Sequence, residues 1–247
     1  MIEELRNKVK ELFASKRVDV VLGYQRAVDG VSAKPLFIYN QEDAERLVWD
    51  SYCVYNLACY LKELAGKKVG IIAKACDVKS IAVLLQENQW KSQDLFVIEV
   101  EEVKPSAPAD KYESVRKLEA KSASERLKFW EEEFSRCIRC YACRQVCPMC
   151  YCPRCVADQS MPAWFSRANS LKGNLSWNVT RAMHLAGRCI DCGECERACP
   201  VGIPLRDLNK KIEKDVKELF NYEAGSSVEQ KPLLSCFDKN DPTDFIK

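Results

Sequence analysis

Several features that would place a chain of 247 residues in a common class are missing from this sequence. No apolar run approaches the roughly 20 residues that a membrane-spanning helix requires. The N-terminus, MIEELRNKVKELF, is charged and amphipathic and lacks the apolar core of a signal peptide. The formal net charge of +2 offers no strong electrostatic footprint for nucleic acid or for an anionic membrane. We therefore expect a cytoplasmic protein that has no membrane span and binds no nucleic acid.

The sequence also lacks the short motifs of several enzyme classes. It contains no GxGxxG, P-loop, G-x-S-x-G or HExxH pattern. Its one histidine, His184, lies in the segment TRAMHLAG. We interpret His184 as a packing or hydrogen-bonding residue of a helix, with a metal-binding or proton-shuttle role as the alternative. No catalytic residue is predicted.

Cysteine, in contrast, is abundant: the chain has 15, and eight of them form two matching runs. The runs read CIRCYACRQVCP and CIDCGECERACP, so both follow the pattern C-x2-C-x2-C-x3-C-P. This is the spacing of bacterial two-cluster ferredoxins, in which thiolates hold [4Fe–4S] clusters. Zinc sites and a disulfide framework are the alternatives, and two complete copies of the pattern argue against both. The chain is predicted to move electrons.

The fourth cysteine of each run is expected to cross over to the other cluster. Three thiolates of the C-x2-C-x2-C turn hold one cluster, while the cysteine before proline conventionally ligates the second. The predicted ligands of the first cluster are Cys137, Cys140, Cys143 and Cys199. Those of the second cluster are Cys189, Cys192, Cys195 and Cys147.

Three further cysteines, Cys150, Cys152 and Cys155, follow the first run at dense spacing. They could form a third metal centre with Cys76, which lies where a predicted strand passes into a helix; Cys53 is the second candidate for the fourth ligand. The carboxyl edge of a parallel sheet, where Cys76 falls, is a usual place for ligands. A third [4Fe–4S] cluster, a structural zinc site and buried thiols without metal all remain open.

Other residues near these motifs have weaker interpretations. Cys59 and Cys236 are interpreted as small packing residues. Arg181 and Arg188 either offset the negative charge of a cluster or are solvated at the surface. Lys74, Asp77 and Lys79, beside Cys76, either form a small polar site or cap a helix. Ile138 and Ile190 occupy equivalent places and are expected to pack on the clusters. The pair Tyr141 and Gly193, also equivalent, predicts two clusters of different potential.

The first hundred residues predict a small α/β domain. Apolar spacing predicts a helix over 2–16, and β-branched or apolar runs predict strands over 18–24 and 35–39. Asn40 is expected to cap a helix that extends to about residue 50, and a further helix covers 54–65. A strand at 67–73, a helix that ends near Glu87 and a strand at 94–100 form a βαβ unit, so the sheet should be mostly parallel.

The rest of the chain predicts an α+β domain of the bacterial dicluster ferredoxin type. We divide the chain into an α/β domain (1–108), a linker and helix (109–133), a ferredoxin-like domain (134–222) and a tail (223–247) that is disordered or docks a partner. The ferredoxin-like domain contains an insertion at 149–186, with a helix near 174–186, and closes with a helix whose apolar residues begin at Leu205.

Two segments resemble known families. SYCVYNLACYL, followed by KKVGIIAKACDVKSIAVLL, resembles the N-terminal domain of the beta subunit of deazaflavin-coenzyme-reducing hydrogenases and dehydrogenases. That family has a small-residue–Cys loop after a strand, which falls on Ala75 and Cys76 here. The half from Cys137 to about Phe220 resembles dicluster ferredoxin modules of heterodisulfide-reductase-linked complexes. The beta-subunit family also carries a C-terminal domain for flavin and substrate, which has no counterpart here, so no flavin is expected.

These observations predict an iron–sulfur subunit of an anaerobic, cytoplasmic oxidoreductase complex. It would relay single electrons between a flavoprotein, hydrogenase or dehydrogenase partner and a heterodisulfide-reductase-like acceptor. The first alternative is a flavin- or deazaflavin-dependent oxidoreductase with its own substrate site near Cys76. The second is a structural adaptor whose metal centres mainly stabilise the fold.

Overall fold

The computed structural model describes residues 1–101, 110–164, 166, 168–236 and 238–243. The chain divides into two compact units, which we describe separately. Unit 1 comprises residues 1–107 and 225–230, and unit 2 comprises residues 108–224 and 231–247. The predicted boundary between the α/β domain and the linker, at residues 108 and 109, lies outside the described residues. Among the described residues, no helix is both long enough and apolar enough to cross a membrane.

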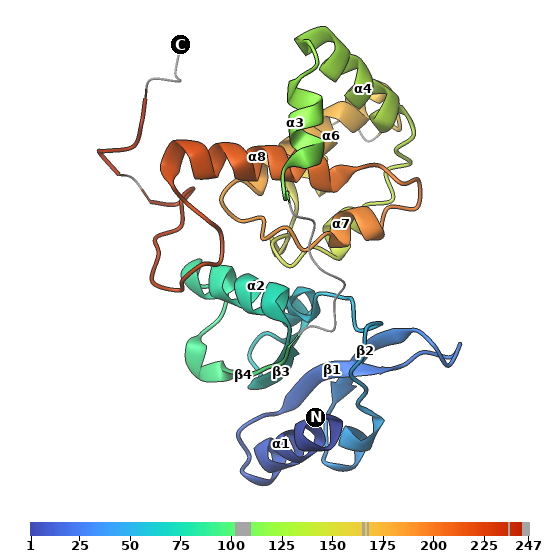
Figure 1. The fold of residues 1–247 in the computed structure, drawn as a ribbon, viewed down its shortest axis with the longest axis vertical. Coiled ribbons are helices and arrows are strands. Elements are labelled where there is room, and N and C mark those ends of the chain that lie inside the picture. The colour runs from blue at the N-terminus through green and yellow to red at the C-terminus, as the bar shows by residue number, and fades with distance from the viewer. Residues whose placement is uncertain (102–109, 165, 167, 237, 244–247) are drawn as a thin grey trace. The chain divides into compact units, whose positions relative to one another are not determined.

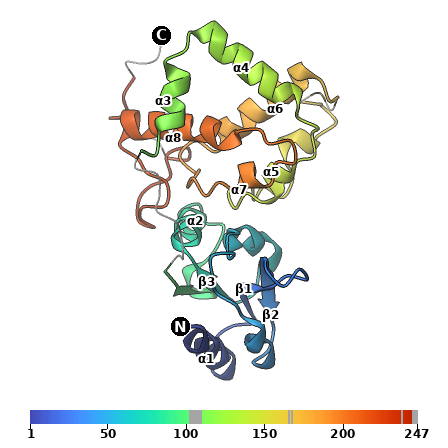
Figure 2. The same ribbon diagram turned by 45° about the vertical axis from the view of Figure 1, so that its right-hand side comes forward.

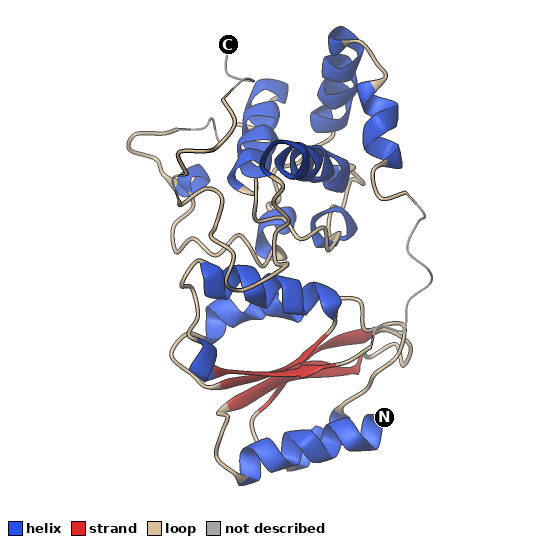
Figure 3. Ribbon diagram, turned by 60° about the vertical axis from the view of Figure 1, so that its left-hand side comes forward, coloured by secondary structure: helices blue, strands red, loops and turns tan. Residues whose placement is uncertain are grey.

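Unit 1 is a four-stranded sheet with helices on both faces (Figure 3). Its strands are β1 (Val20–Arg26), β2 (Ala33–Ile38), β3 (Val69–Ala73) and β4 (Leu95–Glu99), in the order β2-β1-β3-β4. β3 pairs in parallel with both β1 and β4, whereas β2 pairs antiparallel with β1. The mostly parallel sheet predicted from the βαβ pattern is therefore present.

In the described residues of unit 1, two α-helices and three 3₁₀ helices accompany the sheet. Helix α1 (Ile2–Ala14) covers one face of the sheet and α2 (Ala75–Gln86) the other (Figure 3). Val9 of α1 packs with Val21 of β1 and Leu36 of β2 in one buried cluster. The 3₁₀ helices span Glu42–Arg46, Leu57–Leu64 and Ser92–Asp94. The apolar positions that predicted α1 therefore form the core on its side of the sheet.

The helix predicted from Asn40 to about residue 50 is wrong beyond its first turns. Asn40 does accept a hydrogen bond from the Asp43 backbone N–H, at 2.9 Å, but the 3₁₀ helix ends at Arg46. The next residue, Leu47, is extended and fully buried. A Cβ atom on Gly23 would lie 2.4 Å from a Leu47 methyl carbon, so the side chain fills the space that this glycine leaves. Burial of Leu47 outweighs the weak local preference for helix.

The regular secondary structure in the described residues of unit 2 is helical (Figures 1 and 2). Its α-helices are α3 (Glu113–Glu119), α4 (Ala123–Ser135), α5 (Ala142–Gln145), α6 (Leu171–His184), α7 (Glu194–Arg197) and α8 (Leu205–Phe220), with a 3₁₀ helix at Val156–Asp158. The strands of the predicted α+β domain are not found among these residues. That prediction rested on the cysteine spacing alone, and no alternating β-branched run flanks either set of cysteines.

The core of unit 2 is built partly from the cysteines themselves. Phe134 of α4, Cys143 of α5, Ile203 and Leu205 are buried together. Trp130 stacks on Phe134 with ring centroids 5.3 Å apart. The short helices α5 and α7, one from each cysteine run, lie side by side (Figure 2). The two runs are thus brought together at the centre of the unit.

An ionic contact joins α3 to α8 and should make part of the stability depend on pH. Glu119 pairs with Lys211 at 2.9 Å and Lys214 at 2.7 Å, and hydrogen bonds from both ammonium groups lower the pKa of Glu119 to about 2. Because the folded pKa lies below the unfolded value, the stabilisation is complete above about pH 4.5 and is lost as the pH falls towards 2.

We expect Glu119→Gln to lower the free energy of unfolding at pH 7 by no more than about 1 kcal/mol, because the pair is partly exposed to solvent. The difference in the free energy of unfolding between this variant and the wild type should be smaller at pH 3.5. Urea denaturation of both proteins at the two pH values, followed by circular dichroism, measures this. A difference that does not change with pH would contradict the ionic origin.

Candidate metal centres

Four of the predicted ligands surround one cavity in unit 2. Its lining includes Cys137, Cys140 and Cys143 from the first run and Cys199 from the second. Cys143 is buried and Cys140 is exposed, so this cavity reaches the surface of the unit at one side. The structure therefore brings together the sulfurs assigned to the first cluster, including the one from the distant run.

The other four predicted ligands surround a second cavity. Its lining includes Cys189, Cys192 and Cys195 from the second run and Cys147 from the first. All four are partly buried. Three cysteines of one run and the last cysteine of the other thus line each cavity, which is the crossed arrangement expected from the spacing.

The backbone explains how each short run can wrap a cavity. Arg139 and Tyr141 have positive φ angles of 58° and 60°, and the equivalent Asp191 and Gly193 have 57° and 76°. Alternation of left-handed and right-handed residues turns successive N–H groups towards a common point, which favours an anion. Backbone N–H groups of Asp191 and Glu194 donate to the sulfurs of Cys189 and Cys192. The two runs therefore share a backbone form as well as a spacing.

Tyr141 takes the left-handed conformation although glycine would adopt it with less strain. Its ring packs edge-on against Trp177 of α6, with centroids 5.0 Å apart, and the guanidinium of Arg144 lies 5.0 Å from its ring centre. At the equivalent place, Gly193 lies beside Arg206, and a Cβ atom there would make an ordinary contact, 3.7 Å from Arg206 Cδ. The two centres thus differ in their surroundings at this position, and the predicted difference in potential stays a prediction.

Burial makes these thiols reluctant to ionise without a metal. It raises the pKa of Cys143, Cys189 and Cys192, and raises that of Cys195 to about 11. Metal binding requires the thiolate and releases the proton. Cys147 differs, because a hydrogen bond from the Cys150 thiol lowers its pKa to about 6.

Buried amides support both cavities, and sequence reasoning missed them. Asn174 of α6 donates to the carbonyl oxygens of Phe134, at 3.0 Å, and Cys137, at 2.8 Å. Asn209 of α8 donates to Cys195 Sγ at 3.7 Å and to the Leu205 carbonyl oxygen at 2.9 Å. The only signal in the sequence was an asparagine on the apolar face of a predicted helix.

The donor sets fit two [4Fe–4S] clusters. Each cavity is lined by four cysteines, and backbone N–H groups donate to sulfur at both, that of Ile203 to Cys199 Sγ at 3.4 Å at the first and those of Asp191 and Glu194 at the second. Ile190 is buried at the second cavity, whereas Ile138 at the first is 54% exposed. Within the part of the chain that the structure describes, no three His, Cys, Asp or Glu side chains gather closely enough to share a single metal ion. Ligands around a cluster of four irons stand farther apart than ligands around one ion.

The residues proposed for a third centre belong to different units. Cys76 lies in the first turn of α2 and Cys53 is buried, both in unit 1. Cys150, Cys152 and Cys155 lie in unit 2, where Cys150 contacts Cys147 and Cys155 accepts a hydrogen bond from Arg144. Whether these cysteines share a metal stays a prediction.

The remaining predicted positions divide between core and surface. Cys59 is buried, as predicted, whereas Cys236 is exposed and does not pack in a core. His184 is exposed at the last turn of α6, so the packing role predicted for it is not found. Arg188 is partly exposed, but Arg181 is buried.

The polar residues beside Cys76 form a closed network, not an open site. Lys74 Nζ donates to the Tyr55 carbonyl oxygen at 2.6 Å, contacts the Tyr24 hydroxyl, and pairs with Asp77 Oδ2 at 3.0 Å. Asp77 also accepts from the backbone N–H groups of Leu57, at 2.6 Å, and Lys74, at 2.9 Å. Lys74 and Asp77 thus cap α2 and satisfy each other in the interior.

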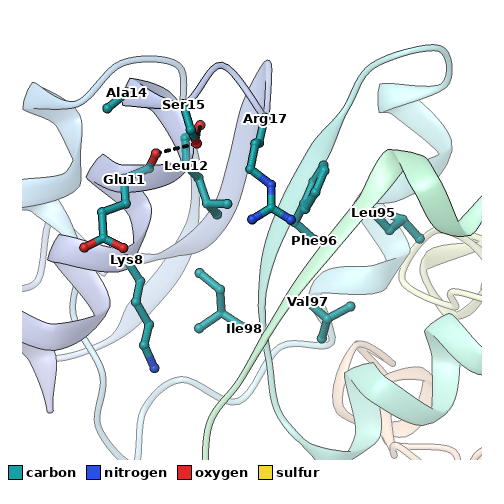
Figure 4. A pocket seen from close by; sticks show the side chains of 10 residues that line it. All are labelled: Lys8, Glu11, Leu12, Ala14, Ser15, Arg17, Leu95, Phe96, Val97 and Ile98. Carbon is teal, nitrogen blue, oxygen red and sulfur yellow. Dashed lines mark hydrogen bonds between the residues drawn. The ribbon is translucent and has the colours of Figure 1, made fainter.

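A groove of unit 1 lies elsewhere, between α1 and the edge strand β4 (Figure 4). It has a volume of about 730 Å³. The guanidinium of Arg17 lies 4.6 Å from the ring centre of Phe96 in this groove, and Lys8 and Glu11 flank it. None of the predicted site residues lines it.

Comparisons with known proteins agree with both halves of the predicted resemblance. Residues 136–204 match a family described as a 4Fe-4S dicluster domain. The chain is also similar to the F420-dependent formate dehydrogenase subunit beta of Methanocaldococcus jannaschii, with 31% identity over 110 residues, which cover 44% of this chain and 28% of the relative. The F420-dependent formate dehydrogenase 1 subunit beta of Methanococcus maripaludis is 32% identical over 110 residues, covering 43% and 27%.

The chain therefore contains a 4Fe-4S dicluster domain and is related to these beta subunits, and the resemblance predicted from the sequence is confirmed. The match spans little more than a quarter of each curated relative.

Proposed function

We propose that this chain is an electron-transfer subunit of an anaerobic, cytoplasmic oxidoreductase complex. It relays single electrons between a flavoprotein, hydrogenase or dehydrogenase subunit and a heterodisulfide-reductase-like acceptor. The single observation that carries the proposal is the pair of adjacent cavities, each lined by four cysteines that come from both runs. The relatives are named as subunits of larger dehydrogenases, which supports a role within a complex.

In this proposal Cys137, Cys140, Cys143 and Cys199 hold one [4Fe–4S] cluster, and Cys189, Cys192, Cys195 and Cys147 hold the other. The clusters supply one-electron chemistry. The protein supplies the rest: the thiolates fix the position, the N–H groups of the left-handed turns offset negative charge at sulfur, and the buried Ile190 limits access of water to the second site. Tyr141 and Trp177 at one cavity, and Arg206 at the other, set different surroundings and hence different potentials.

The proposal is tested by anaerobic analysis of iron, acid-labile sulfide, zinc and flavin on the purified chain. We expect about eight irons and about eight sulfides per chain, the content of two [4Fe–4S] clusters. About twelve irons would indicate a third cluster and direct attention to Cys76, Cys150, Cys152 and Cys155. Zinc in place of most of the iron would overturn the relay function, and bound flavin would favour a flavin-dependent enzyme with its own substrate site.

A further inference from the structure

Arg181 is a buried cation that the insertion helix α6 places between the two cysteine runs. Only 5% of this residue is exposed to solvent. Nη2 donates a hydrogen bond to the carbonyl oxygen of Cys143, at 2.9 Å, in the first run. The same arginine lines the cavity of the second run. One guanidinium therefore touches the walls of both centres.

The groups that interact most strongly with Arg181 are cysteine sulfurs of both runs, among them those of Cys147, Cys143 and Cys195. Within the described residues Arg181 forms no ion pair with a carboxylate, and its Nε atom is buried without a hydrogen-bond partner. The unpaired Nε indicates that part of the positive charge is not yet compensated by the protein.

A buried guanidinium without a counter-charge destabilises the fold, because the solvation lost on removal from water is offset only by a nearby negative charge. A [4Fe–4S] cluster held by four thiolates is an anion, and it gains one more negative charge when it is reduced. A buried cation beside it stabilises the reduced form more than the oxidised form, which raises the reduction potential.

We propose that Arg181 is the internal counter-cation of both clusters and raises the potential of the second cluster most. This inference rests on the proposed function, because it assumes that the two cavities hold clusters. The stronger effect on the second cluster follows from position: Arg181 lines that cavity, whereas it does not line the first and reaches it through the backbone carbonyl of Cys143. Arg181 acts through the cluster environment and is not itself a ligand.

The experiment is a redox titration of the full chain, with each cluster followed by electron paramagnetic resonance. We expect Arg181→Gln to lower the potential of the second cluster by at least a tenfold change in its reduction equilibrium, about 59 mV for a one-electron couple. The first cluster should shift in the same direction by less. Arg181→Lys keeps the charge and should restore most of the potential.

Lys172→Gln is the matched control, because it removes the same charge from an exposed position on the same helix. It should leave both potentials close to those of the wild type, since solvent screens its charge. Iron content is measured on every variant. Normal iron with unchanged potentials in Arg181→Gln would overturn the inference and leave the relay function intact, whereas a wild-type chain without clusters would overturn the proposed function. If Arg181→Gln loses iron, Arg181→Lys is compared with the wild type instead. Cluster potentials close to those of the wild type support the inference, because the positive charge is retained. A lower potential of the second cluster in Arg181→Lys contradicts it.

Discussion

Replacing Cys147 with serine is expected to remove the cluster of the opposite run, that of Cys189, Cys192 and Cys195. Cys147 lines their cavity and does not line the cavity of its own run. The mirror variant, Cys199→Ser, should remove the cluster of Cys137, Cys140 and Cys143. Each substitution should reduce the iron content from about eight to about four per chain.

Double variants identify which cluster is lost by iron content alone. If the ligands cross, Cys147→Ser combined with Cys192→Ser affects one cluster and leaves about four irons, while Cys147→Ser combined with Cys140→Ser affects both and leaves almost none. If each run holds its own cluster, the two results exchange. Cys236→Ser, at an exposed cysteine of the tail, is the control and should retain about eight irons.

Cys150 adds one complication that the same assay resolves. Its thiol donates a hydrogen bond to Cys147, so it stands close enough to replace a lost ligand after a small movement. If Cys147→Ser alone retains about eight irons, Cys147→Ser with Cys150→Ser should fall to about four. Full iron content in that double variant would show that Cys147 is not a ligand.

The sequence predicted those features that depend on local pattern. The spacing of the cysteines predicted that the first three of each run line one cavity, because a short loop restricts where its thiols can reach. The βαβ pattern of residues 67–100 predicted β3, α2 and β4 because an apolar strand and an amphipathic helix have different periods. In both cases the decisive residues are neighbours in the chain.

Features set by distant residues were not predictable in the same way. The 3₁₀ helix after Asn40 stops because Leu47 fills a space beside Gly23, and nothing near Leu47 in the sequence indicates that space. The fold of unit 2 was predicted as α+β from cysteine spacing, yet spacing describes only the loops that hold the sulfurs. Asn174 supports the first centre through carbonyl groups of Phe134 and Cys137, which are far from it in the chain.

Replacing Asp77 with alanine should be the most damaging single change in unit 1. Asp77 is fully buried, and burial, the largest influence, raises its pKa against the opposing effects of the Lys74 ammonium and of nearby N–H groups. Alanine would leave the Lys74 ammonium buried without its carboxylate and the N–H groups of Leu57 and Lys74 without acceptors. Breaking a buried ion pair from one side costs about 3–5 kcal/mol.

That loss is a large part of the total stability of a domain, typically 5–15 kcal/mol (order of magnitude). Hydrogen exchange of the β3 amides, measured at increasing urea, reports the stability of unit 1 directly. Glu63→Ala, which removes an exposed carboxylate from the same unit, should change the free energy of unfolding by no more than about 0.5 kcal/mol.

The cause of the Asp77 effect can be separated from simple loss of packing. Lys74→Met removes the cation and leaves the carboxylate buried, so it should also destabilise unit 1. In Lys74→Met combined with Asp77→Ala no buried charge remains, and the double variant should lose less stability than the sum of the two single losses. If the losses instead add, the two residues contribute independently, and the lysine–aspartate pair does not act as a unit in holding α2 against the Leu57–Leu64 helix.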